Sequence, residues 1–256
     1  MKNIFVSSVR DESEQIFKLA EKYDLGIEVL GFIEPYKLND YNMTIESVKG
    51  KLSNIHKRSL HGPFIDLFPG SVDPEIVRVV NNRFLTAYET ARKFEAQHII
   101  FHAGYVPKAT FPKAWINNSV KFWDNFLSEI KENIEIHIEN LCEEDFNIIR
   151  ELVEAINSSM FSICLDIGHV NVNSSKNLEE WIKGLGDNIK YVHLHNNDGL
   201  SDNHWGLCRG NIDILKTLEL LELHSPNANW SLETKLDETE ESILLLDKYG
   251  FIKSEC

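Results

Sequence analysis

A short stretch near residue 190 carries the densest set of side chains that could do chemistry. Residues 191–195 (YVHLH) read as a buried strand, and because side chains alternate along a strand, His193 and His195 point to the same face. Asp202 and His204 follow in the next loop, where their alternation lets both point inward. Imidazoles and carboxylates are ligands for zinc and similar divalent metals. The stretch therefore indicates a metal site that other strand ends would have to complete.

Composition limits the classes of protein to which the chain can belong. Its 256 residues are 43% hydrophobic, which fits one large domain over 1–256. A net charge of −14 argues against a broad nucleic-acid surface. The four cysteines have no CxxC spacing and read as reduced thiols, and no signal peptide is recognised, so we expect a cytoplasmic protein. No apolar run approaches the roughly 20 residues of a membrane span, so no membrane partner is expected.

Hydrophobic periodicity predicts strands that alternate with helices or long loops along the whole chain. We expect strands at 4–6, 25–30, 58–64, 98–104, 134–140, 161–169 (including an exit loop), 191–195 and 230–234. We expect helices at 13–23, 44–52, 73–94, 115–131, 146–156, 178–185, 212–223 and 238–249. Eight such units predict an α/β fold, the parallel (β/α)8 TIM barrel with outer helices. A doubly wound open sheet is the alternative, and the absence of a glycine-rich loop after the first strand weakens it.

One metal-binding or acidic residue marks the end of each strand from the second to the eighth. These residues are Glu28, His61, His102, Glu139, Asp166, His193 and Glu233, spaced by 27 to 41 residues. All strand ends of a parallel barrel meet at one face, so we expect these side chains to converge there. His169 follows Asp166 by three residues, and a tight turn can bring both to one ion. The remaining histidines, read as ordinary surface or core residues, are His56, His98, His137 and His224.

The strand-end motifs resemble those of the xylose isomerase-like barrel superfamily, which also contains endonuclease IV. The motifs are 60–64 (LHGPF), 101–104 (FHAG), 138–140 (IEN), 165–169 (LDIGH), 192–196 (VHLHN), 202–204 (DNH) and 232–234 (LET). The three-zinc endonuclease IV pattern implies ligands at His61, His102, Glu139, Asp166, His169, His193, Asp202, His204 and Glu233. The one-metal pattern of sugar isomerases and epimerases implies the subset Glu139, Asp166, His193 and Glu233. The chain departs from both at 207–210 (LCRG), where Cys208-Arg209 replaces the usual Gly-Glu.

Two enzyme chemistries follow from this resemblance, and both need a divalent metal. In a sugar or sugar phosphate isomerase or epimerase, one Zn, Mn, Mg or Co ion holds the substrate carbonyl while Glu139 and Glu233 move protons beside it. In an endonuclease IV-like phosphoesterase, two or three zinc ions activate water against an apurinic site or a small phosphodiester. Arg209 is the only cation noted close to the motifs, and cations are what nucleic acid would require.

The remaining expectations concern the ligand rather than the metal. A small carbohydrate is the expected partner, with substrate contacts expected from Glu28, Asn140, His195 and Arg209. A non-catalytic barrel that binds a metabolite is a third hypothesis, against which the complete ligand set argues. An assembly of identical copies is compatible with the sequence.

Overall fold

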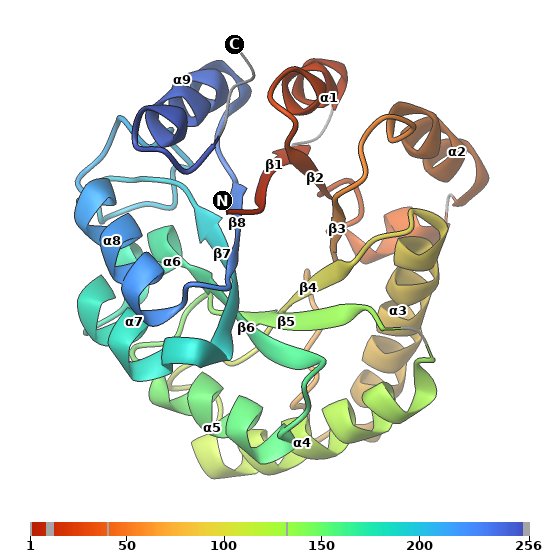
Figure 1. Cartoon of the computed structure of the whole chain (residues 1–256). Helices are drawn as coiled ribbons and strands as arrows, with labels where there is room; N and C mark the ends of the chain where they lie inside the picture. The colour runs from red at the N-terminus through yellow and green to blue at the C-terminus, as the bar shows by residue number, and fades with distance from the viewer. Residues whose placement is uncertain (1, 9–12, 40, 132, 253–256) are drawn as a thin grey trace.

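Eight parallel strands close into a barrel in which each strand pairs with the next and β1 pairs with β8 (Figure 1). This computed structural model describes residues 2–8, 13–39, 41–131 and 133–252. The strands are β1 (Ile4–Ser8), β2 (Gly26–Val29), β3 (Arg58–His61), β4 (His98–His102), β5 (Glu135–Glu139), β6 (Phe161–Asp166), β7 (Ile189–Leu194) and β8 (Asn229–Leu232). The predicted (β/α)8 architecture is confirmed, and the open-sheet alternative is excluded.

Helices surround the barrel on its outside (Figure 1). They are α1 (Ser13–Lys22), α2 (Tyr41–Lys51), α3 (Pro74–Lys93), α4 (Pro112–Glu129), α5 (Asn147–Ile156), α6 (Ile167–Asn173), α7 (Leu178–Leu185), α8 (Ile214–His224) and α9 (Leu236–Lys248), with short 3-10 turns η2 (Pro35–Asn39) and η3 (Gly186–Asn188). The start of α3 follows its sequence signal, because Asp73 accepts a hydrogen bond from the Glu75 amide at 2.8 Å and Pro74 occupies the first turn. No helix among the described residues is long and apolar enough to cross a bilayer.

The main departure from the sequence expectation lies directly after β6. The exit loop expected there is the helix α6, which begins at Ile167 without any intervening residue. Asp166 explains this start, because its carboxylate accepts a hydrogen bond from the His169 amide at 2.7 Å and so caps the helix. The last residue of a strand is therefore also the first cap of a helix, which places His169 one turn above Asp166.

The barrel interior is more polar than the shell between the strands and helices. Outward-facing side chains such as Val6, Ile27 and Leu60 belong to one large apolar core. A small inner cluster made of Phe5, Ile100, Cys164 and Tyr191 forms a layer across the barrel. Above it, at the carboxyl ends of the strands, the inward positions carry mainly histidine and acidic side chains. Because side chains alternate along each strand, the barrel wall has an apolar outer face and an inner face that can bind ions.

Candidate metal centre

Glu139, the last residue of β5, lies at the middle of the barrel mouth and is almost fully buried. Its Oε2 is 3.1 Å from Nε2 of His61 and 3.2 Å from Nε2 of His102. Its Oε1 is 3.1 Å from Nδ1 of His193. One carboxylate therefore contacts imidazoles from β3, β4 and β7, which the chain brings together only through barrel closure.

Four buried donor side chains form a compact group on neighbouring strands. Glu139, Asp166, His193 and Glu233 each offer one ligand atom, and these atoms lie within 4.8 Å of one another. Nδ1 of His193 is 3.1 Å from Oε2 of Glu233 and 3.7 Å from Oδ2 of Asp166. Oε2 of Glu233 is buried and accepts no hydrogen bond from any described residue. Its ion pair with His193 leaves that oxygen without a hydrogen bond, and a buried acceptor in this state fits a divalent cation.

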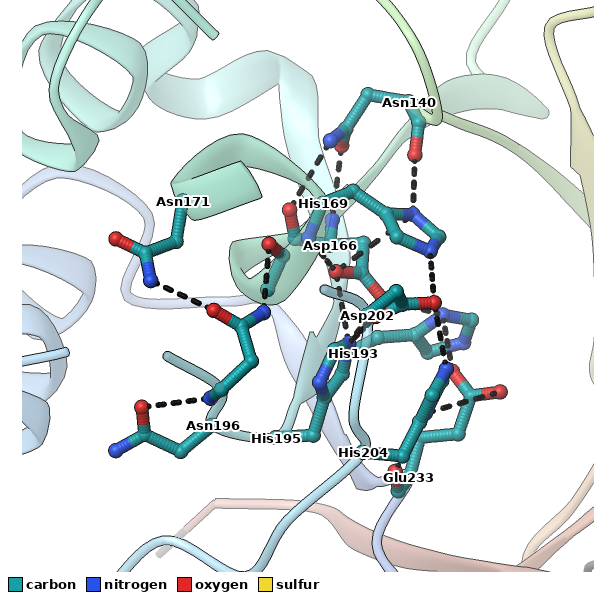
Figure 2. A network of polar contacts seen from close by, with 12 residues as sticks. Asn140, Asp166, His169, Asn171, His193, His195, Asn196, Asp202, His204 and Glu233 are labelled. Atoms are coloured by element: carbon teal, nitrogen blue, oxygen red, sulfur yellow. Dashed lines mark hydrogen bonds and ion pairs between the residues drawn. The ribbon is translucent and has the colours of Figure 1, made fainter. Parts of the chain in front are cut away.

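A second group of donors lies beside the first, toward the loop that follows β7 (Figure 2). Oδ2 of Asp202 is 3.3 Å from Nε2 of His169 and 2.9 Å from Nε2 of His204. The ring of His195 stacks on that of His204, with centroids 4.1 Å apart. Compact donor groups place Asp166 with Glu139 and His169 with Asp202, while Nδ1 of His169 is also 3.7 Å from Oδ1 of Asp166. That Asp166 and His169 approach one ion stays a prediction.

In most of these histidines one ring nitrogen faces the barrel mouth, and the other contacts a carbonyl or carboxylate oxygen on the far side of the ring. A carbonyl or carboxylate oxygen can only accept, so the nitrogen that faces it must carry the proton. These pairs are His61 Nδ1 with Gly62 O (2.9 Å), His169 Nδ1 with Asn140 O (2.7 Å), His204 Nδ1 with Glu233 O (2.9 Å) and His193 Nε2 with Glu28 Oε1 (3.1 Å). Such an arrangement fixes the tautomer and ring orientation of metal-ligating histidines.

Three residues expected to contact a substrate instead contact the donors. Glu28 is buried behind His193 and accepts a hydrogen bond from the Tyr191 hydroxyl at 3.0 Å. The Asn140 amide pairs with the backbone of Asp166, donating at 3.0 Å and accepting at 2.8 Å. Nε2 of His195 lies 3.0 Å from Oδ1 of Asp166. Glu28 and Asn140 position the donors, whereas His195 is itself a donor of the second group, and direct contact of all three with a substrate stays a prediction.

Arg209 lies apart from the donor groups. Its guanidinium is 2.9 Å from Oε1 of Glu238 at the start of α9 and stacks 4.0 Å over the Trp205 ring. It is not among the residues that line the pocket at the mouth, whereas Lys235 is. The expectation that Arg209 is the only cation near the motifs was therefore wrong. Lys235 follows Glu233 by two residues, and that short spacing was the available signal.

The mouth encloses a pocket of about 440 Å³ above the donors. Its polar lining comes from His61, His102, Glu139, His169, Asp202, Asn203, His204, Glu233, Thr234 and Lys235. Sequence reasoning missed its apolar lining, which comes from Leu30, Ile33, Phe64 and Leu141. The Phe64 ring stacks on His102 with centroids 3.8 Å apart and an interplanar angle of 4°. Its position three residues after His61 was a signal that it follows the strand into the mouth.

Burial and mutual attraction shift the pKa values of the donors in opposite directions. Burial alone would raise the pKa of Glu139, but His102 and His193 hold it well below its usual value. Burial would lower the pKa of His169, yet Asp166 and Asp202 raise it well above the ordinary range. Without metal, the mouth is thus a network of ion pairs in which imidazolium protons occupy positions that a cation would take.

Comparison with known proteins identifies a family and a shared fold. The family described as "Xylose isomerase-like TIM barrel" matches residues 15–249. The uncharacterized protein MJ1614 of Methanocaldococcus jannaschii is 31% identical, over 72% of this chain and 77% of its own. A structure of the TTHB071 protein from Thermus thermophilus, soaked with ZnCl2, aligns with a TM-score of 0.77 at 22% identity over 97% of this chain and 98% of that one. A D-tagatose 3-epimerase-like protein aligns with a TM-score of 0.78 at 24% identity, covering 97% of each chain.

Proposed function

The chain belongs to the xylose isomerase-like TIM barrel family, and from this premise we propose that it is a metal-dependent isomerase or epimerase of a small sugar or sugar phosphate. The observation that carries the proposal is the four-donor group Glu139, Asp166, His193 and Glu233 beneath the pocket. The likeness in fold to a D-tagatose 3-epimerase-like protein supports it.

The donor set suits a hard or borderline divalent cation such as Mn²⁺, Mg²⁺, Co²⁺ or Zn²⁺. Three carboxylates and one imidazole provide oxygen and nitrogen ligands, and Glu28 holds the far nitrogen of His193. A cation bound there supplies a Lewis acid that makes the hydrogen beside a carbonyl more acidic.

Proton transfer is the task of Glu139 and Glu233, which come from β5 and from the end of β8. One carboxylate removes the proton from the carbon beside the carbonyl, and the electron pair of that bond moves into the carbonyl group. The other returns a proton, to the opposite face of the same carbon in an epimerase or to the former carbonyl carbon in an isomerase. In the isomerase the proton of the neighbouring hydroxyl also passes to the former carbonyl oxygen, so that the hydroxyl becomes the new carbonyl. Leu30, Ile33 and Phe64 give the pocket in which this occurs an apolar lining. A volume of about 440 Å³ suits a small-molecule ligand of this kind.

The test follows exchange of the carbon-bound hydrogen in deuterated water, using ketohexoses, ketopentoses and their phosphates with each of the four metals. Glu233→Gln keeps the side-chain shape but removes the proton acceptor, so turnover should fall by roughly 10²–10⁴-fold. The matched control is Glu219→Gln, an exposed glutamate on α8, which should leave turnover unchanged. The proposal fails if no sugar shows exchange, or if both variants match the parent.

A second candidate function is hydrolysis of a small phosphoester, which the extra donors favour. His61 and His102 flank Glu139, and His169, Asp202 and His204 lie next to them, so the mouth offers ligands for more than one ion. Two or three zinc ions activate water and neutralise phosphate oxygens. Metal-dependent cleavage of a phosphodiester without any sugar exchange would select this function. Binding of a metabolite with neither reaction would leave a non-catalytic barrel.

A further inference from the structure

We propose that the opposite, amino-terminal end of the barrel carries a separate zinc site formed by His98, Glu135 and His137. His98 and Glu135 begin β4 and β5 and pair directly in the sheet register, and His137 is two residues further along β5. All three side chains therefore share the inner face at this end. The three were not singled out from the sequence, since His98 and Glu135 begin their strands and His137 lies in the middle of β5, away from the strand ends that carry the mouth donors.

The spacing of the three donor atoms matches that of zinc ligands. Nδ1 of His98 is 3.0 Å from Nε2 of His137 and 3.5 Å from Oε2 of Glu135. Nε2 of His137 is 3.8 Å from Oε2 of Glu135. Tetrahedral zinc with bonds of ~2.0–2.2 Å holds its ligand atoms about 3.3–3.6 Å apart. Small side-chain rotations therefore suffice to place one ion between them, with water as the fourth ligand.

Second-layer contacts prepare both imidazoles for this role. Nδ1 of His137 lies 2.7 Å from the Ser162 hydroxyl oxygen. Nδ1–H can donate a hydrogen bond to that oxygen, which leaves the lone pair of Nε2 available for a metal. Nε2 of His98 lies 3.3 Å from the Asn229 side-chain amide. The amide nitrogen of Asn229 faces Nε2, and its Oδ1 accepts a hydrogen bond from the Asn3 amide at 3.1 Å, so both amides have to rotate to present an oxygen to Nε2–H when Nδ1 binds a metal. Zinc-bound histidines are held in this way by a polar group behind them.

The exposure of the group also suits a cation. His137 is fully buried, while the Glu135 side chain is 49% exposed and gives the ion a route from solvent.

An aromatic layer separates this group from the centre at the barrel mouth. The Tyr191 ring has its centroid 5.6 Å from that of His98, 5.2 Å from that of His137 and 5.8 Å from that of His193. Phe5 packs against both His98 and Tyr191 in the same layer. An ion at the amino-terminal end is thus isolated from the mouth, and its loss should not alter the proposed reaction.

The experiment counts zinc bound to the full chain after chelation and equilibrium dialysis against excess Zn²⁺. His98→Gln and Glu135→Gln should each bind one zinc fewer than the parent. His56→Gln is the control, an exposed histidine just before β3 at the same end of the barrel, and should bind as many as the parent. Circular dichroism and thermal unfolding establish that the variants are folded, and Glu135→Gln is the milder change because its side chain is half exposed.

A crystal soaked in Zn²⁺ gives a second, independent measurement. An anomalous peak at the zinc edge should lie about 2.0–2.2 Å from Nδ1 of His98, Nε2 of His137 and an oxygen of Glu135. Equal zinc counts in the parent and both variants, or a soaked crystal with no peak at this position, would overturn the site. Hydrogen exchange on sugars is measured in parallel with the zinc count. Each measurement can therefore be interpreted even when the other contradicts its own proposal.

Discussion

At the scale of single residues, His102 separates a one-ion mouth from a mouth that holds several ions. Its Nε2 lies 3.2 Å from Glu139, while its buried Nδ1 has no hydrogen-bond partner among the described residues. His102→Ala leaves no partner of Nδ1 stranded, but it removes the ion pair with Glu139 and the stacking with Phe64. We expect the variant to fold and to bind less metal than the parent at saturating zinc. An unchanged metal count, measured by elemental analysis, would leave only the four-donor site.

His204 gives a prediction about pH in the metal-free protein. Although burial lowers the pKa of its imidazole, the carboxylates of Glu233 and Asp202 raise it to about 9. Because its pKa is higher in the folded than in the unfolded chain, protonated His204 stabilises the fold. This contribution is complete below the pKa of the unfolded chain, about 6.5, and is lost as the pH rises through about 9. The difference in melting temperature between the parent and His204→Gln should therefore shrink from pH 6 to pH 10. A difference that stays constant or grows would contradict this electrostatic account.

At the scale of elements, the junction between β6 and α6 depends on the small size of Gly168. A Cβ at this position would lie 1.9 Å from Cε1 of His195, whose ring is buried and held against Asp166. Gly168→Ala should displace His195, weaken metal binding and destabilise the fold by about 1–3 kcal/mol through overpacking. Gly50→Ala in α2 is the matched control, because its Cβ meets no atom within 4 Å. Zinc titration and thermal unfolding of both variants decide the point, and equal behaviour would refute it.

The same junction shows why part of the site escaped sequence reasoning. The donor types of the four-residue group and their order could be read directly, since each stands at the end of an apolar strand. The division of Asp166 and His169 between two groups could not, because it follows from the capping hydrogen bond that starts α6 without a loop. Arg209 likewise pairs with Glu238, a residue brought near only when α9 packs beside the last loop. Local sequence patterns show which residue types stand at the strand ends. Strand register and helix placement determine where those side chains point and which of them meet.

At the scale of the whole molecule, metal binding should stabilise the barrel. Binding to the folded chain alone contributes about 2.7 kcal/mol when free metal is at 100 times its dissociation constant. For a domain of this size each kcal/mol shifts the melting temperature by roughly 2–4 °C, so we expect a rise of roughly 5–10 °C. Differential scanning fluorimetry of the chelated protein with and without Zn²⁺ or Mn²⁺ measures it. A melting temperature that neither metal moves would argue against a preformed centre.

The closed order of the strands also sets when the centre can be loaded during the life of the chain. Glu233 immediately follows β8, the strand that closes the barrel between β7 and β1, while Glu139, Asp166 and His193 are made earlier. Until β8 has been made and has paired with β7 and β1, the centre lacks its fourth donor, so complete loading has to follow closure of the barrel. The ion recovered with the purified protein therefore reports the metal pool that the finished chain encounters, and expression in media of different metal content should change its identity without changing the fold.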